Sequence, residues 1–163
     1  LMLDATGSIG LEEGHNLSDV STFSSCKGLF GLTGASFIAY NNDPKNSVKS
    51  FYMDINTHIN KKLTGPYHTI GSLYHVLKNY NKFKNAVKKN KLKFLRDNYQ
   101  YLIYPQKNQP LLCTYSKIKY KNKSKKVIIY QSRKKIEGCV VSHLGETYLK
   151  NNAKGLIQKY LLK

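Results

Sequence analysis

Two residues near the start of the chain, Lys27 and Asp4, are of types that can together perform chemistry on a carbonyl compound. Lys27 stands in a run of small residues and glycines, Ser24-Ser25-Cys26-Lys27-Gly28, between two β-prone segments. Asp4 directly follows the apolar residues 1–3. An amine held on such a loop can attack a carbonyl carbon, and a carboxylate at a strand end can pair with a protonated ring nitrogen. A pyridoxal phosphate (PLP) site requires these two protein groups.

The elements that must hold these residues are short strands joined by glycine-rich loops. We expect strands at residues 1–3, 19–25 and 35–40, with loops at 4–10 and 27–34. This order suits the end of an open α/β sheet, in which ligands bind outside the carboxyl ends of the strands. Apolar residues then recur at helical spacing, which predicts helices over 47–60, from about residue 67 onward, and over 81–96.

The last part of the chain changes character and predicts a small α+β domain. It contains apolar segments typical of strands at 111–115, 127–130 and 139–142, a basic loop at 117–126, and an amphipathic closing helix at 146–162. A domain boundary within the long helix, near residues 80–98, divides the chain into domains at 1–80 and 81–163. Because the chain opens inside a strand without an initiator Met, we expect it to be part of a larger protein.

The net charge of +18 is distributed unevenly. Residues 1–44 hold one basic and five acidic residues, whereas residues 45–163 hold 26 basic and four acidic residues. Only Arg96 and Arg133 are arginines, although proteins that read bases and phosphates usually enrich arginine for its bidentate fork. An A/T-rich genome also favours the codons of Lys, Asn and Tyr, which then accumulate at solvent-exposed positions. We therefore favour solvated lysines over a nucleic-acid partner.

Several other functional classes find no support in the sequence. Cys26, Cys113 and Cys139 are an odd number of cysteines without close spacing, which suits a reducing cytoplasm. No apolar run approaches membrane-spanning length, so we expect no membrane partner. The five histidines form no H-x-x-x-H pattern and the cysteines form no C-x-x-C pattern, so we expect no metal site. No histidine is singled out as a base for Cys26.

Several segments resemble the class V aminotransferases of fold type I. Residues 4–10, 24–28 and 31–37 carry the family likeness, and residues 50–55 and 63–69 are similar to the 2-aminoethylphosphonate–pyruvate transaminases within it. Residues 127–130 and 144–146 resemble the same enzymes near their carboxyl end. The resemblance covers about the carboxyl half of a typical member. It implies an α/β fold: the carboxyl part of a fold type I PLP-transferase large domain (1–80), followed by a small carboxyl-terminal α+β domain (81–163).

The resemblance also implies roles for individual residues. Lys27 would bind the cofactor covalently, Asp4 would pair with the pyridine nitrogen, and Ser24 would touch the cofactor phosphate. Thr6 would lie near the hydroxyl edge of the ring. Thr64 would reach the phosphate of the neighbouring subunit's cofactor, which implies a homodimer with shared sites. From the residues alone, Asp4, Thr6 and Ser24 could instead be turn residues, and Thr64 could be a residue at a helix start.

The chain departs from the family pattern at the substrate's acidic group. Val140 stands where family members carry an arginine, and Arg133 and His143 are the nearest cations in sequence that could replace it. We assign Arg133 to substrate binding, although it also suits a solvated basic run. The glycine-rich phosphate loop and the ring-stacking residue of the family's amino-terminal half are absent.

The expected activity is therefore that of a cytoplasmic aminotransferase. It would transfer an amino group from 2-aminoethylphosphonate, or a similar small amine, to pyruvate, and we expect this chain in isolation to be inactive. One alternative is another class V PLP enzyme, such as a serine or alanine aminotransferase or a lyase. A second alternative is a degenerate, non-catalytic basic binding module.

Overall fold

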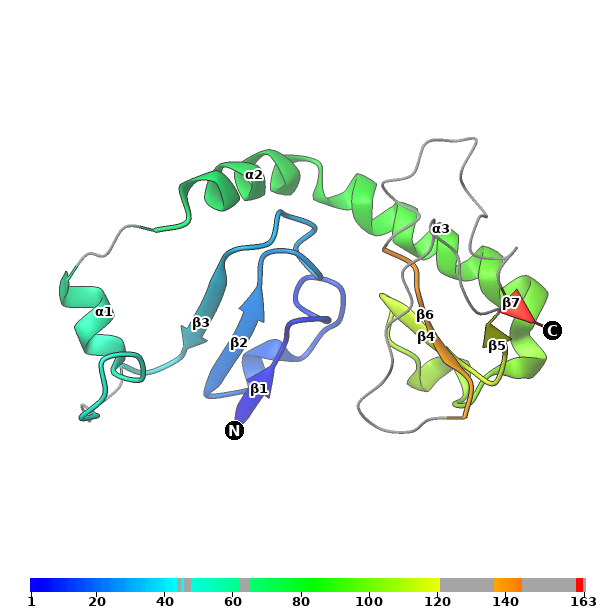
Figure 1. The fold of residues 1–163 in the computed structure, drawn as a ribbon, viewed down its shortest axis with the longest axis horizontal. Coiled ribbons are helices and arrows are strands. Elements are labelled where there is room, and N and C mark those ends of the chain that lie inside the picture. The colour runs from blue at the N-terminus through cyan, green and yellow to red at the C-terminus, as the bar shows by residue number, and fades with distance from the viewer. Residues whose placement is uncertain (44, 46–47, 62–64, 121–136, 145–160, 163) are drawn as a thin grey trace. The chain divides into compact units, whose positions relative to one another are not determined.

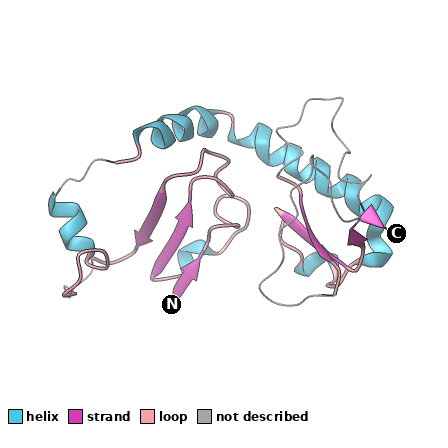
Figure 2. Ribbon diagram, in the orientation of Figure 1, coloured by secondary structure: helices cyan, strands magenta, loops and turns pink. Residues whose placement is uncertain are grey.

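The computed structural model describes the chain except for residues 44, 46–47, 62–64, 121–136, 145–160 and 163. The chain has a mixed α/β fold and divides into two compact units, Leu1–Tyr80 (unit 1) and Asn81–Lys163 (unit 2) (Figures 1 and 2). This confirms the expected mixture of helices and strands. The assignment of the two units to the domains of a PLP enzyme stays a prediction.

Unit 1 contains a three-stranded sheet of order β1-β2-β3. Its strands are β1 (Met2–Asp4), β2 (Val20–Ser24) and β3 (Ser36–Tyr40). Strands β1 and β2 are parallel, and β3 is antiparallel to β2. All three predicted strands of this region are confirmed to within one residue or so at each end. The register places Asp4 opposite Thr22 and stacks the rings of Phe23 and Phe37 at 5.3 Å between centroids.

The core of unit 1 is small and lies where the loops meet the helix after the sheet. The buried apolar residues of this unit are Ala5, Leu11, Phe30, Ala35 and Leu73. Helix α2 (Tyr67–Lys78) begins where the sequence predicted it. It is joined to the loop before β3, because the Thr69 hydroxyl donates to the Thr33 carbonyl at 3.0 Å and Leu32 N–H donates to Ser72 Oγ at 3.3 Å.

The helix predicted over 47–60 is wrong in its first half. Helix α1 spans only Ile55–Lys61, and residues 48–54 before it are irregular, with a turn at 51–53. The cause is Asp54, whose carboxylate accepts hydrogen bonds from the Thr57 hydroxyl at 2.7 Å and the Asn56 N–H at 3.3 Å. An aspartate that binds the first free donors of a helix fixes the start of that helix, whatever apolar spacing precedes it.

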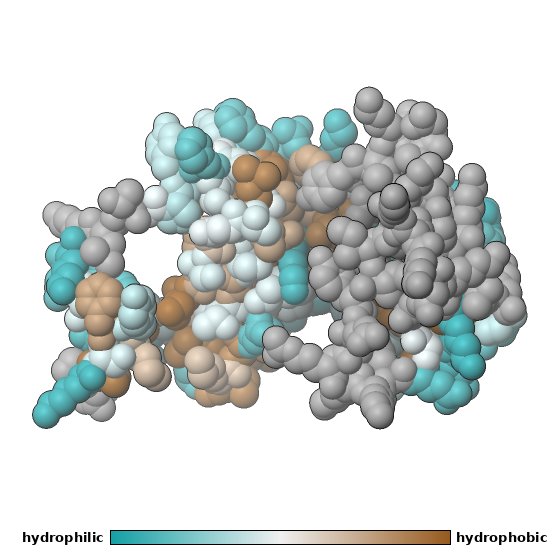
Figure 3. Space-filling view, in the orientation of Figure 1, coloured by the Kyte–Doolittle hydropathy of each residue, from teal (hydrophilic) through white to brown (hydrophobic). Residues whose placement is uncertain are grey.

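Unit 1 leaves a large amount of apolar surface exposed (Figure 3). The first two residues, Leu1 and Met2, are each 76 % exposed, and β1 is an edge strand of the sheet as described. Helix α2 also presents a solvent-facing row of large side chains, namely Tyr67, Ile70, Tyr74 and Leu77. Exposed apolar surface beside an open strand edge favours association with another chain or segment.

Unit 2 is built on the long helix α3 (Tyr80–Asn98), whose first residue belongs to unit 1. The periodicity prediction of this helix is confirmed. Two short 3₁₀ helices follow, at Tyr99–Tyr101 and Gln106–Asn108. Strands β4 (Cys113–Ser116) and β6 (Cys139–Ser142) form one antiparallel pair, and β5 (Lys119–Tyr120) and β7 (Leu161–Leu162) form another. The central apolar cluster is Phe94, Ile118 and Val141.

The end of unit 2 agrees with the sequence analysis only in part. The strands predicted at 111–115 and 139–142 are confirmed, with β4 beginning two residues later. The predicted strand at 127–130 lies outside the described residues, as does most of the predicted helix at 146–162. The last two residues of that helix are instead the strand β7, which pairs with β5 inside the predicted basic loop. Pairing with a distant strand overrides the local helical periodicity there.

Within the described ranges, no helix combines the length and the apolar character needed to cross a membrane.

Candidate functional site

Asp4 and the loop that carries Lys27 lie at the same edge of the unit 1 sheet. Asp4 is the last residue of β1, and Lys27 follows the end of β2 at Ser24. Because β1 and β2 are parallel neighbours, their carboxyl ends meet at one edge, where α/β sheets bind their ligands. The side chains of Asp4 and Lys27 are both exposed at this edge.

The carboxylate of Asp4 is held in place by Thr6. The Thr6 N–H donates to Asp4 Oδ1 at 3.0 Å. Hydrogen bonds from the Thr6 hydroxyl and from the Thr6 backbone, and then the positive charge of Lys27, hold the pKa of Asp4 below its ordinary value of 3.8. Asp4 is therefore an oriented anion at neutral pH, close enough to Lys27 to respond to its charge. Thr6 acts here as the partner of this carboxylate.

Ser24 lies on the same face of the sheet as Asp4. Asp4 is opposite Thr22 in the register, and side chains two residues apart on a strand share a face. Ser24 is half-buried, and its hydroxyl lies 3.7 Å from Cys26 Sγ. The sequence analysis overlooked Thr22, which is half-buried between Asp4 and Ser24 on this face. The alternation of side chains along β2, which places Thr22 and Ser24 on the same face, is the sequence signal that indicates Thr22.

The loop between β2 and β3 is closed by the buried residue Ser25. Its hydroxyl donates to the Leu32 carbonyl and accepts the Ala35 N–H at 3.4 Å. Its carbonyl accepts the Gly31 N–H at 2.7 Å. Ser25 has no exposed surface, so these bonds are shielded from water and fix both ends of the loop around Lys27.

The loop of Lys27 and the loop after Asp4 are packed directly against each other. Gly28 N–H donates to the Thr6 carbonyl at 3.3 Å. A Cβ atom on Gly28 would collide with the carbonyl oxygen of Ile9, so only glycine permits this approach. The two loops therefore hold Asp4 and Lys27 as one assembly.

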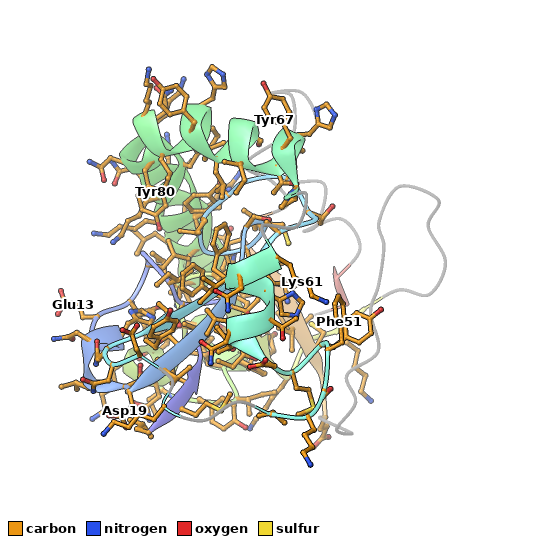
Figure 4. All side chains as sticks on the ribbon, turned by 90° about the vertical axis from the view of Figure 1, so that its left-hand side faces the viewer. Glu13, Asp19, Phe51, Lys61, Tyr67 and Tyr80 are labelled. Carbon is orange, nitrogen blue, oxygen red and sulfur yellow. The ribbon has the colours of Figure 1, made fainter. Side chains whose placement is uncertain are left out.

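Tyr80, which is labelled in Figure 4, braces this assembly through a hydrogen bond. Its hydroxyl donates to the Gly28 carbonyl at 2.9 Å, and its ring lies 5.3 Å from that of Phe30. A Cβ atom on Gly10, which has a φ of 73°, would collide with the Tyr80 hydroxyl. Burial raises the pKa of Tyr80, which keeps its hydroxyl protonated as a donor. No sequence pattern singled out Tyr80, because its partners Gly28 and Phe30 lie 52 and 50 positions away.

Phe30 is held in an unfavourable backbone conformation beside Lys27. It is the single residue other than glycine with a positive φ among the described residues, at 60°, and its side chain is buried. A left-handed conformation costs a bulky residue about 1 kcal/mol or more. The packing of Phe30 against Tyr80 offsets this cost.

The other predicted site residues give a mixed result. Thr64 and Arg133 lie outside the described residues. Val140 lies on β6 of unit 2, opposite Tyr115, and is 44 % exposed. His143 was a sequence candidate for the missing cation, and that suggestion is wrong. Burial, aided by the charge of Lys91, lowers the pKa of His143 to about 3, so its ring is neutral at physiological pH.

His143 belongs instead to a buried polar cluster in unit 2. Its Nε2 shares a hydrogen bond of 2.8 Å with Thr114 Oγ1, and its carbonyl accepts from Asn90 Nδ2 at 3.2 Å. Lys91 is also buried and donates to the carbonyls of Gln109 and Pro110 at 3.0 and 2.8 Å. The sequence analysis did not predict this cluster. The signal was that Lys91 falls on the apolar side of α3.

The described residues contain no group of three His, Cys, Asp or Glu side chains that could hold a metal ion. A scan against models of protein families, a search of curated proteins and a search of solved structures each find no match to this chain.

Proposed function

We propose that this chain is part of a PLP-dependent aminotransferase with a fold type I large domain in unit 1 and a small carboxyl-terminal domain in unit 2. One observation carries the proposal. Asp4 and Lys27 emerge at the carboxyl ends of adjacent parallel strands, and hydrogen bonds from Thr6, followed by the charge of Lys27, lower the pKa of Asp4. A carboxylate and an amine in this arrangement suit the ring nitrogen and the carbonyl carbon of one PLP molecule.

The donor set of this edge fits the cofactor. Asp4 is ionised and oriented by Thr6, as a partner for a protonated pyridine nitrogen must be. Lys27 is exposed on a braced loop, so its amine can reach a carbonyl group at the sheet edge. The Ser24 hydroxyl would contact the phosphate, and Thr64 is assigned to the phosphate in a partner subunit. When bound, PLP supplies an electron sink for a carbanion at the substrate carbon.

Lys27 would have two tasks in the reaction. Its amine would first hold the cofactor covalently and would be displaced when the amino group of a substrate takes its place. The freed amine would then carry a proton to and from the reacting carbon as a general base and acid. Asp4 would keep the ring nitrogen protonated throughout, because its own low pKa keeps it anionic.

We propose 2-aminoethylphosphonate, or a similar small amine, as amino donor and pyruvate as acceptor, in a cytoplasmic homodimer. A phosphonate in a closed pocket needs a cationic partner. His143 is neutral and Val140 is apolar, so Arg133 is the remaining residue that we assign to this role. If Arg133 does not serve, the donor is one used by other class V enzymes, such as alanine or serine.

An absorbance titration with PLP tests the proposal on the chain as it stands. We expect a visible absorption band that the Lys27→Ala variant lacks. Lys49→Ala is the matched control, because Lys49 is an exposed lysine of the same unit outside the candidate site. Equal bands for the wild-type chain and the Lys27→Ala variant would contradict the proposal.

A further inference from the structure

The excess positive charge of this protein belongs entirely to unit 2. Residues 81–163 contain 21 of the 27 basic residues and three of the nine acidic residues, a net charge of +18. Residues 1–80 contain six of each and are neutral. The net excess of positive charge therefore lies in unit 2.

A genome-wide composition bias does not explain this distribution. A/T-rich codons enrich asparagine together with lysine, so such a bias should raise both residues in both units. The number of asparagines is indeed similar in the two units, with seven in 1–80 and eight in 81–163. The number of lysines differs, with six in 1–80 and 19 in 81–163. The lysine excess of unit 2 thus needs a cause that acts on this unit alone.

The clearest surface on which these charges gather is one side of α3. Lys82, Lys89, Lys93 and Arg96 are all exposed and fall within a sector of about 60° on a helical projection. They extend over about 21 Å of helix at 1.5 Å per residue. We call these four residues the α3 basic stripe. The opposite side of the helix is buried at Val87, Phe94 and Leu95, and Phe94 packs in the apolar cluster of unit 2.

The charges of the α3 basic stripe are scarcely neutralised by neighbouring acids. Among the salt bridges of the described residues, one involves this stripe, from Arg96 Nε to Asp97 Oδ1 at 3.2 Å. The three lysines form none there. A row of like charges repels itself, and a bound polyanion relieves that repulsion.

From these observations we infer that unit 2 binds the phosphate backbone of a nucleic acid along the α3 basic stripe, without reading its sequence. Lysine is a compact point charge that contacts phosphate but lacks the planar fork with which arginine reads guanine. The stripe spans about six base-pair steps at 3.4 Å each. The scarcity of arginine argues against base reading, whereas lysine can contact backbone phosphates as a point charge.

An anionic membrane is a poorer partner for this helix. A helix that lies in a membrane surface inserts an apolar side between the lipids. In α3 that side is already buried, and Phe94 packs there against Ile118 and Val141 of unit 2. The inference does not depend on PLP binding by unit 1, because the α3 basic stripe lies wholly in unit 2.

Fluorescence anisotropy with two labelled 20-base-pair DNA duplexes of unrelated sequence tests the inference on the full chain. Binding should be equal for both duplexes and should weaken steeply between 50 and 200 mM KCl. The triple variant Lys82→Gln, Lys89→Gln, Lys93→Gln should reduce the slope of log K against log salt by about 2.7. Its affinity at 0.1 M salt should fall by about 10²-fold or more.

The matched control is the triple variant Lys107→Gln, Lys117→Gln, Lys119→Gln. It removes the same charge from exposed positions of unit 2 outside α3 and should change the affinity less than tenfold. Absence of wild-type binding at 50 mM KCl would overturn the inference, and so would equal losses in the two triple variants. If poly-glutamate displaces the labelled duplex at a lower concentration of charge than unlabelled duplex does, the inference is overturned and an acidic protein is the better partner. The PLP absorbance band, measured on the same samples, reports separately on the proposed function.

Discussion

The buried ring of His143 makes a quantitative prediction about the pH dependence of stability. Its pKa is about 3 in the folded chain and 6.5 when unperturbed, with burial as the main cause and the charge of Lys91 as the second. Between these values the unfolded chain binds a proton that the folded chain does not bind. The free energy of unfolding must therefore fall as the pH decreases below 6.5, with the loss complete near pH 3.

The magnitude follows from the two pKa values. At pH 5 the unfolded histidine is almost fully protonated while the folded one is almost fully neutral. With 1.36 kcal/mol per pH unit, this single group removes about 2 kcal/mol of stability between pH 8 and pH 5. That loss is a large fraction of the stability of a small domain.

Urea unfolding at pH 8, 7, 6 and 5, compared with the His143→Gln variant, isolates this contribution. The variant lacks the titrating ring, so the wild-type chain should lose about 2 kcal/mol more than the variant over this range. His75→Gln removes an exposed histidine of unit 1 and should follow the wild-type curve. Parallel pH curves for the wild-type chain and His143→Gln would show that the ring is not buried against Lys91 and Thr114 as described.

Three further predictions concern the candidate site. Tyr80→Phe should remove the hydrogen bond to Gly28, destabilise unit 1 by about 1 kcal/mol and speed amide hydrogen exchange in residues 26–31. Tyr74→Phe, at an exposed position, should have neither effect. Unchanged hydrogen exchange in both variants would refute the bracing role of Tyr80. In the longer protein to which we assign the chain, Asp4→Asn should leave PLP binding measurable but lower transaminase turnover at least a hundredfold. The reason is that an amide does not keep the ring nitrogen protonated. Near-normal turnover of this variant would show that Asp4 is a turn residue. In the same protein, Val140→Arg should leave kcat/KM for 2-aminoethylphosphonate unchanged, because we assign the phosphonate to Arg133. A rise of tenfold or more, about 1.4 kcal/mol, would show that no cation serves the phosphonate.

Local sequence patterns correctly predicted the elements that depend on residues close together in the sequence. The strands around Asp4 and Lys27 follow from short β-prone runs between glycine loops, and α2 and α3 follow from helical spacing. The start of α1 was missed because one side chain, Asp54, overrides the periodicity before it. The end of unit 2 was missed where β7 pairs with a strand about forty positions away, a contact that no local pattern encodes.

The sequence predicted that Asp4 and Lys27 lie at one edge of the sheet, but it did not predict the residues that support them. Residue type and spacing were sufficient to pair Asp4 with Lys27. They were not sufficient to find Tyr80, whose hydroxyl reaches Gly28 across 52 positions. They also placed Lys91 among the solvated lysines, although its ammonium group is buried on two carbonyl oxygens. A lysine on the apolar side of a helix is the pattern that distinguishes such a case.

The most direct measurement of the central claim is reduction of the PLP-treated chain with borohydride, followed by peptide mapping. Reduction fixes a cofactor that is bound to an amine, so it also records weak binding. We predict that the pyridoxyl group is found on Lys27 well above any of the other 24 lysines, and that Asp4→Asn weakens this selectivity. Label spread evenly over the lysines, or concentrated on another lysine, would contradict the assignment of Lys27 and with it the proposed PLP site.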